Sequence, residues 1–354
     1  MRSLRPRDLA LGIGLGISLG LATTAAAARF VSHSPASLDG IGEYTSLALD
    51  PLGRAHVAYF DRAREVLVHA FETPGGWRTE VVDGAGRVGW YASVALDPRG
   101  TLRIAYYDVD RGVLKLASAS GGAWTNEVVD PTPGAGHYCS LALAPDGTPG
   151  ISYYDVTHGS LRFARLARGT WRIETVDGAP GEAAALAAGD GAGAIGSSER
   201  AEPFDNVGHY ASLAFDRQGL AHIGYQDITH SSLKYAVERP GRWDIATVDA
   251  QGDVGEHTSL ALDPSGRARM SYYDASNGAL KFAAERRDGW AIETVDAAGN
   301  AGAYSSLRLD PNGEPHVCYL AATEGTLRYA TESAGVWRRE TVDAGGAPGR
   351  GGAP

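Results

Sequence analysis

Short runs of β-prone residues, separated by turn-forming residues, follow one another along most of the chain. One stretch shows four such runs, at Ser46–Asp50, His56–Asp61, Val66–Phe71 and Arg78–Asp83. The first two are joined by Asp-Pro-Leu-Gly, where proline presets a turn and glycine accepts a positive φ. The runs carry apolar residues on both faces, and no stretch after residue 28 has the period of an amphipathic helix. The pattern therefore predicts antiparallel four-stranded sheets covered on both faces.

The four-strand pattern recurs six times, mostly at an interval of 47 residues. A serine opens each copy, at Ser46, Ser93, Ser140, Ser212, Ser259 and Ser306. A tryptophan follows each serine, at Trp77, Trp124, Trp171, Trp243, Trp290 and Trp337. Tandem four-stranded units are typical of propeller blades. We therefore expect an all-β protein, a single six-bladed β-propeller at 29–343, with antiparallel blades whose repeats start near residues 42, 89, 136, 208, 255 and 302.

Three segments fall outside this repeat. Residues 1–28 have a basic start, an apolar run and small residues up to Ala28, which favours a cleaved signal peptide. An uncleaved anchor is the alternative, because Leu9–Ala28 is nearly long enough to span a bilayer. One repeat carries a glycine- and alanine-rich insertion at 178–203, which we expect to be a mobile loop, and 344–354 is expected to be a disordered tail. The predicted location is secreted or periplasmic, with no membrane span after cleavage.

The closure of the ring of blades is left open by the sequence. Blades one and six could pack directly on each other, or Phe30–Ser32 could add a strand beside the last blade. Arg308 replaces a small residue of the other repeats and either reaches solvent at the closure seam or faces the channel. Cys139 and Cys318 belong to repeats three and six, on opposite sides of a closed ring, so we predict two free thiols.

The net charge of −10 excludes one class of partner. A negative field repels a phosphate backbone, and the chain has no lysine- or arginine-rich run. We therefore expect no nucleic-acid partner, and a monomer whose partner is a carbohydrate or protein ligand.

Candidate binding residues lie where the repeats differ. Each blade-linking loop ends in Gly-x-Tyr-x-Ser, and the variable residue is Glu43, Trp90, His137, His209, Glu256 or Ala303. The following position is Tyr44, Tyr91, Tyr138, Tyr210, His257 or Tyr304. In propellers such loops commonly surround the channel mouth, where we expect the ligand to bind. Trp90 lies outside the repeated tryptophan pattern, and an exposed aromatic ring at this place would suit a sugar.

Four histidines are the most specific chemical feature of the chain. His137 and His209 share the predicted mouth with His158 and His230, which belong to loops between second and third strands of repeats three and four. Imidazoles at this density could bind a divalent transition metal or act as acid and base, with Glu43, Glu256 and His257 completing the site. The catalytic candidates are His137, His209, Tyr138 and Tyr210. The alternative is that repeats three and four inherited these loop residues together, without a joint task.

Other recurring polar residues are assigned to structure. The aspartates that end second and fourth strands are expected to accept backbone N–H groups in turns, because nearly every repeat carries them. The six repeated tryptophans are expected to pack between blades. His56, His222 and His316, at strand starts, are also predicted to be structural.

The string Ser-Leu-Ala-Leu-Asp-Pro-x-Gly, with a His-x-x-Tyr run and Leu-Lys-Tyr-Ala, resembles secreted bacterial β-propeller repeats. Its Asp-x-x-Gly hairpin is similar to that of NHL-type propellers. A narrower similarity, through Asp216-Arg217-Gln218-Gly219, His222, Tyr225 and Leu233-Lys234-Tyr235, is to the neuraminidase-repeat group that includes some polysaccharide lyases. That resemblance implies proton transfer by histidine and tyrosine. The Asp-box spacing of sialidases is absent from the chain.

Two functions from different classes follow. The first is a non-enzymatic binding or scaffold module for a carbohydrate or protein partner, because the chain shows no recognisable nucleophile motif, phosphate loop or complete triad. The second is a polysaccharide lyase or metal-assisted hydrolase that uses the histidines of blades three and four. The sequence favours the binding module without deciding whether the protein is an enzyme, and it identifies no cofactor beyond the divalent metal already considered.

Overall fold

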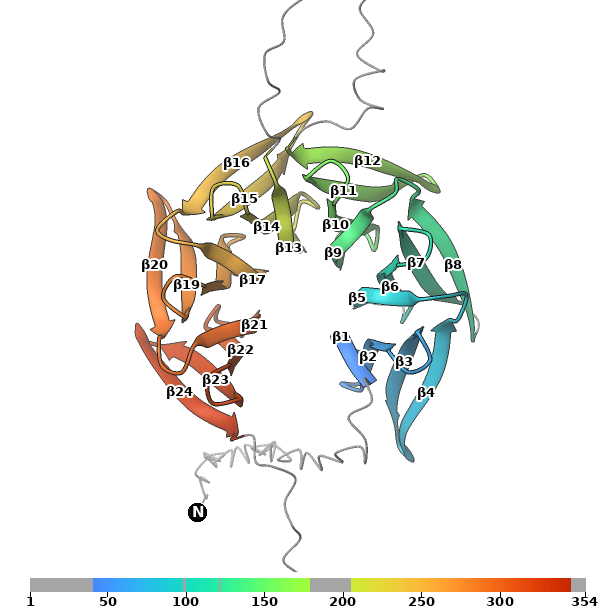
Figure 1. The fold of residues 1–354 in the computed structure, drawn as a ribbon, viewed down its shortest axis with the longest axis horizontal. Coiled ribbons are helices and arrows are strands. Elements are labelled where there is room, and N and C mark those ends of the chain that lie inside the picture. Colours follow the sequence, from blue (N-terminus) through green and yellow to red (C-terminus); the bar gives the residue numbers. More distant parts are fainter. Residues whose placement is uncertain (1–40, 98–99, 121, 179–204, 345–354) are drawn as a thin grey trace, which may run out of the picture. The chain divides into compact units, whose positions relative to one another are not determined.

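The computed structural model describes residues 41–97, 100–120, 122–178 and 205–344, which form 24 strands. Every four consecutive strands make one antiparallel sheet in chain order. The six sheets are arranged as the blades of a β-propeller (Figure 1). The predicted fold class is therefore confirmed, and no helix is present in the described part of the chain.

The first three blades have strands of similar length. Blade one contains β1 (Ile41–Leu49), β2 (Ala55–Asp61), β3 (Val66–Thr73) and β4 (Gly76–Asp83). Blade two contains β5 (Val88–Leu96), β6 (Leu102–Asp108), β7 (Val113–Ser120) and β8 (Ala123–Asp130). Blade three contains β9 (Ala135–Leu143), β10 (Pro149–Asp155), β11 (Ser160–Ala167) and β12 (Thr170–Asp177).

The last three blades repeat the same design. Blade four contains β13 (Val207–Phe215), β14 (Ala221–Asp227), β15 (Ser232–Arg239) and β16 (Arg242–Asp249). Blade five contains β17 (Val254–Leu262), β18 (Ala268–Asp274), β19 (Ala279–Arg286) and β20 (Gly289–Asp296). Blade six contains β21 (Ala301–Leu309), β22 (Pro315–Ala321), β23 (Thr326–Ser333) and β24 (Val336–Asp343).

The first strand of each blade starts earlier than the sequence pattern predicted. In blade one we expected it from Ser46, but β1 begins at Ile41 and includes the Gly-x-Tyr segment that had been assigned to the blade-linking loop. The ladder between β1 and β2 shifts register on both sides of Glu43, and Tyr44 has a left-handed φ of 52°. These shifts form β-bulges, which continue the pairing and turn the side chains of the segment.

Consecutive blades pack through the same contacts at each interface. The first-strand serine accepts a hydrogen bond from the next blade, as when Val94 N donates to Ser46 Oγ over 3.0 Å. Apolar residues of both blades share one core at each interface, and the tryptophan of the second blade packs against that core. Trp124 also donates from Nε1 to Glu80 of blade one over 2.9 Å. The predicted packing role of the tryptophans is confirmed at these five interfaces.

A buried carboxylate adds a polar link at each interface. In blade four Asp249, at the end of β16, accepts hydrogen bonds from Tyr272 Oη (2.7 Å) and Lys281 Nζ (2.5 Å) of blade five. Its other oxygen accepts from the backbone N–H of Gln251, as the turn assignment predicted. The tyrosine and the cation belong to the following blade, so the same aspartate closes a turn and joins two blades.

The seam between blades six and one differs from the other five. Leu47 and Leu49 of β1 are 55% and 61% exposed and Trp77 is 58% exposed, whereas Leu141, the equivalent of Leu47 in blade three, is 7% exposed. On the other side of the seam, Arg308 is exposed. Among the described residues, blade six therefore does not cover the apolar residues of blade one as the other blades cover their neighbours. The exposure of Arg308 is compatible with both of its predicted alternatives.

Several predictions lie outside the described residues. They are the signal peptide at 1–28, the Phe30–Ser32 strand, the insertion beyond its first residue Gly178, and the tail beyond Ala344. Both cysteines are free, as predicted, with Cys139 buried and Cys318 exposed. None of the described residues forms a helix long and apolar enough to cross a membrane.

Candidate functional site

The bulges at the start of the six first strands bring one aromatic ring per blade into a continuous arc. Neighbouring ring centroids lie 4.3–4.8 Å apart along the series Tyr44, Tyr91, Tyr138, Tyr210, His257, Tyr304. All six residues have φ between 51° and 56°. We call this series the aromatic rim. Its members come from every blade, so the arc exists only because the blades share an axis.

The hydroxyl groups of Tyr91, Tyr138 and Tyr210 in the rim keep their protons near neutral pH. Burial raises the pKa of Tyr91, Tyr138 and Tyr210, and neighbouring tyrosines or Glu256 raise it further. A protonated phenol can both donate and accept a hydrogen bond. Tyr304, at the end of the arc beside the seam, is 73% exposed.

The variable residues pack against the rim from outside. His137 lies between Tyr91 and Tyr107, with ring centroids 5.2 and 4.4 Å away, and His209 has the same place one blade further on, beside Tyr138 and Tyr154. Burial lowers the pKa of both histidines, that of His209 to about 4. Both rings are therefore neutral at pH 7, and Nε2 of His209 is buried without a hydrogen-bond partner.

Trp90 and the two glutamates complete this region. Trp90 is only partly exposed, because it packs against Tyr44, Phe60 and Tyr91, so it is not the freely exposed platform that we had expected. Glu43 pairs with Arg62 at 2.5 Å. Burial and the neighbouring Asp253 raise the pKa of Glu256. His257 belongs to the rim itself, and burial lowers its pKa to about 4.

The other two predicted histidines have partners of their own. His158 Nδ1 lies 2.7 Å from Asp155 Oδ2, and His230 Nδ1 lies 2.9 Å from Asp227 Oδ2. Each aspartate ends the second strand of the same blade. Within the described ranges, no group of three or more His, Cys, Asp or Glu side chains is placed to hold a metal ion. The hypothesis that His137, His158, His209 and His230 bind one metal therefore gains no support from their positions.

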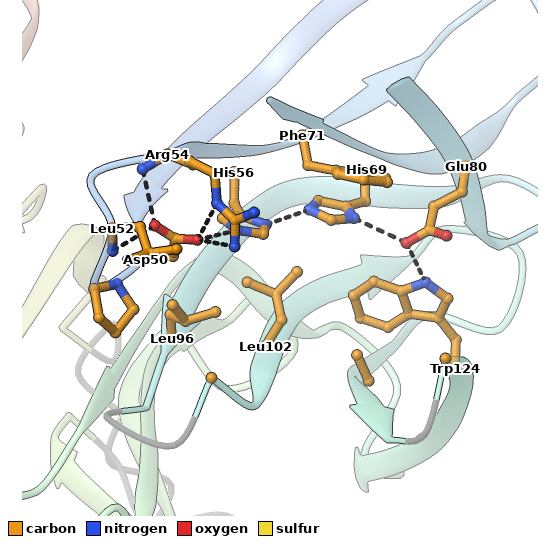
Figure 2. Close-up of a pocket in the computed structure, with 14 residues that line it drawn as sticks. Asp50, Leu52, Arg54, His56, His69, Phe71, Glu80, Leu96, Leu102 and Trp124 are labelled. Atoms are coloured by element: carbon orange, nitrogen blue, oxygen red, sulfur yellow. Dashed lines mark hydrogen bonds and ion pairs between the residues drawn. The ribbon is translucent and has the colours of Figure 1, made fainter. Parts of the chain in front are cut away.

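A second site, which sequence reasoning missed, lies between blades one and two (Figure 2). It is a pocket of about 540 Å³, lined by the β1–β2 hairpin, by β3 and β4, and by residues of blade two. That volume is within the range of roughly 300–1,000 Å³ usual for small-molecule sites. Because β1 runs from the rim to this hairpin, the pocket and the rim are at opposite ends of the strands.

One wall of this inter-blade pocket is a chain of hydrogen-bonded side chains. His56 Nδ1 lies 3.0 Å from His69 Nε2, and the planes of the two rings are nearly parallel, with an interplanar angle of 3°. His69 Nδ1 lies 2.9 Å from Glu80 Oε1, which also accepts from Trp124 Nε1. Figure 2 shows the line of contacts running from Asp50 through both imidazoles to Glu80 and Trp124.

The sequence contains a signal for this pocket, namely the spacing of its two histidines, but His56 was assigned to a structural role. His56 and His69 are 13 residues apart, and the same spacing joins His222 to Tyr235 and His316 to Tyr329. In blade four both ring nitrogens of the histidine have partners, because His222 Nδ1 bonds to Tyr235 Oη and His222 Nε2 lies 3.4 Å from Asp216 Oδ2. The structural assignment therefore fits His222, whereas His56 has a nitrogen beside an open pocket.

Comparisons with known proteins agree on the fold. No family model matches the chain, and no curated protein matches it. An ulvan lyase of a polysaccharide lyase family is similar over 86% of this chain and 84% of its own, with 11% identity and a TM-score of 0.59. The periplasmic gluconolactonase of Pseudomonas aeruginosa is similar over 85% of both chains, with 15% identity and a TM-score of 0.52.

A Dyadobacter fermentans protein of unknown function is also similar, over 84% of this chain and 93% of its own, with 12% identity and a TM-score of 0.52. At these identities the likeness shows the propeller architecture alone, because one fold carries many functions.

Proposed function

We propose that the protein is an exported, non-enzymatic propeller that binds a carbohydrate at the aromatic rim. The observation that carries this proposal is the unbroken arc of rings contributed by all six blades. Aromatic faces offer apolar contact to the carbon–hydrogen face of a sugar, and protonated tyrosine hydroxyls offer hydrogen bonds to its hydroxyl groups. A large apolar contact with a few polar groups is typical of ligand sites.

Two further observations support a sugar. The proteins with similar folds include a polysaccharide lyase and a gluconolactonase, and the second is periplasmic. Predicted cleavage after Ala28 would place this chain in the same kind of compartment. A protein ligand is the competing occupant of the rim.

The test is a glycan array followed by calorimetry on the mature chain. We expect binding to a defined glycan, weakened by about tenfold when Tyr138→Phe and Tyr210→Phe are combined, because two hydroxyl groups are lost and the rings remain. Tyr329→Phe, on β23 away from the rim, is the control and should bind normally. An array without any bound glycan, together with a protein captured through the rim, would replace the carbohydrate by a protein partner.

Catalysis is the alternative to be separated from binding. Neutral imidazoles at His137 and His209 beside Tyr138 are chemically able to accept a proton. Incubation of the protein with any glycan it binds, followed by detection of new reducing ends or unsaturated products, distinguishes the two. Turnover that disappears in both His137→Ala and His209→Ala would make the protein an enzyme.

A further inference from the structure

The hydrogen bonds in the inter-blade pocket fix where the protons are. A carboxylate can only accept, so Nδ1 of His69 carries a proton and donates it to Glu80. In the neutral ring Nε2 of His69 is then an acceptor, and Nδ1 of His56 must donate to it. The remaining nitrogen, Nε2 of His56, therefore carries a free lone pair.

None of the described residues has a hydrogen-bonding atom within hydrogen-bond distance of that nitrogen. It lies 3.9 Å from Asp50 Oδ2, which is too far for a hydrogen bond. Asp50 instead accepts from the Arg54 side chain and from the backbone N–H groups of Leu52 and Arg54. Burial lowers the pKa of His56 and of His69, which keeps both rings neutral near pH 7.

The rest of the pocket combines an apolar surface with few charges. Blade two contributes Leu96, Leu102 and Trp124, all uncharged. Among the described residues that line it, the charged ones are Asp50, Arg54 and Glu80, so two negative groups face one positive group. An anionic ligand would be repelled, and a neutral ligand with hydroxyl donors and an apolar face would match both walls.

We propose that the inter-blade pocket binds a neutral sugar unit, with one ligand hydroxyl donating to Nε2 of His56 and the carbon–hydrogen face of the ring packed against Leu96 and Trp124. This site is separate from the aromatic rim and does not rest on the function proposed for it.

Comparison of the blades supports a dedicated site. At the corresponding interface of blades three and four, Phe215 fills the space, since a Cβ on Gly150 would lie 2.5 Å from its ring. In blade five the position of His56 is Arg269, which bonds to Asp263. His222 in blade four has contacts at both ring nitrogens. These interfaces fill the space or satisfy the side chain, whereas blade one leaves an acceptor open.

The experiment is a titration of the mature protein with neutral and acidic monosaccharides and short oligosaccharides, followed by saturation-transfer NMR and calorimetry. We expect a neutral sugar to bind and a uronic acid to bind at least tenfold more weakly. His56→Ala should weaken binding at least tenfold, whereas His56→Gln, whose amide oxygen can accept, should retain part of it. His222→Ala is the matched control, and the rim variant Tyr138→Phe/Tyr210→Phe should bind the pocket ligand normally.

The pH dependence gives an independent readout. His56 faces Asp50 and Arg54 from its own hairpin and His69 from β3, which is bonded to Glu80 of β4, while the blade-two lining residues that the structure describes are uncharged. Protonation removes the acceptor at Nε2, so binding should weaken as the pH falls, with a midpoint below the ordinary histidine value of about 6.5 because burial lowers the pKa of His56. Binding that weakens already above pH 6.5, resists His56→Ala, or favours the uronic acid would overturn the proposal, as would failure of every neutral sugar to bind. Loss of rim binding with this site intact would count only against the function proposed for the rim.

Discussion

At the scale of single residues, the buried aspartates at the ends of fourth strands both close a turn and bind side chains of the next blade. The side chain of Asp249 is 2% exposed, and that of its partner Lys281 is 10% exposed. Burial alone would raise the pKa of Asp249, but hydrogen bonds from Lys281, Gln251 N and Tyr272 lower it below its usual value. The carboxylate is thus stabilised in its charged form by the next blade.

Replacing this carboxylate should uncouple blades four and five. Asp249→Asn removes the nearer of two counter-charges from the buried Lys281 ammonium and leaves only Asp274, at 3.7 Å, which should lower the free energy of unfolding by about 3 kcal/mol. Urea unfolding at pH 7 measures the loss. The control is Asp244→Asn, whose carboxylate pairs with Arg239 and Arg242 on the surface and whose loss should leave stability unchanged within error. Equal stability of the two variants would show that the buried link contributes nothing.

The same pair makes stability depend on acid. Because the folded-state pKa of Asp249 is lowered, its contribution is fully present above the unfolded value of about 3.9 and is lost as the pH falls through the folded value. The Asn variant should therefore lose less stability than the wild type between pH 5 and 2. Parallel curves for the two proteins would contradict this assignment.

At the scale of the strand, the bulge that creates the rim depends on a glycine. Gly208 has φ of 108°, and a Cβ placed on it would lie 2.8 Å from Cα of Leu161 in the preceding blade. Gly241, in the β15–β16 turn, has φ of 75° with no atom within 4 Å of such a Cβ. Both positions have a positive φ that would strain a residue with a side chain, but only Gly241 has space for an added methyl group.

Gly208→Ala should therefore cost far more stability than Gly241→Ala. We expect about 1 kcal/mol for Gly241→Ala from the left-handed backbone alone, and about 3 kcal/mol or more for Gly208→Ala, because its methyl group meets backbone that cannot move aside. Thermal and urea unfolding report the two values. Similar losses would mean that the neighbouring blade gives way and that the close approach is not required.

The strands themselves were predictable, because turn residues and the repeat mark both ends of most of them. The early start of β1 was missed because a left-handed tyrosine reads as loop in sequence, while the bulge keeps it paired. The inter-blade pocket was missed for another reason. His56, His69 and Glu80 meet only through the register of three strands, and Trp124 comes from the next blade. Comparing the repeats position by position at the 13-residue spacing of His56 and His69 would have found it.

At the scale of the whole molecule, the repeat leaves the interface between blades six and one open, and the described residues form the other five interfaces. The side of blade one that is turned to the seam has apolar residues at the same positions as the other blades, including Leu47, Leu49 and Trp77. Blade six lacks the small first-strand residue of the other blades, because Arg308 occupies the position where they have alanine. A difference at one end of an array is invisible in the average repeat, so the seam could not be derived from the period. Terminal repeats with altered outer faces are common in repeat proteins.

The seam predicts unequal losses of stability for the same substitution in two blades. Leu141→Ala removes a leucine packed between blades two and three and should lower the free energy of unfolding by about 2–4 kcal/mol. Leu47→Ala, at the equivalent position of blade one, removes an exposed side chain and should change stability by less than about 0.5 kcal/mol. A loss for Leu47→Ala as large as that for Leu141→Ala would mean that the face of blade one is covered in solution, so that the ring is closed there.

The same exposed leucines predict self-association, because an exposed apolar face favours association. A Leu47→Ser/Leu49→Ser variant should stay monomeric at concentrations where the wild type begins to self-associate in light scattering.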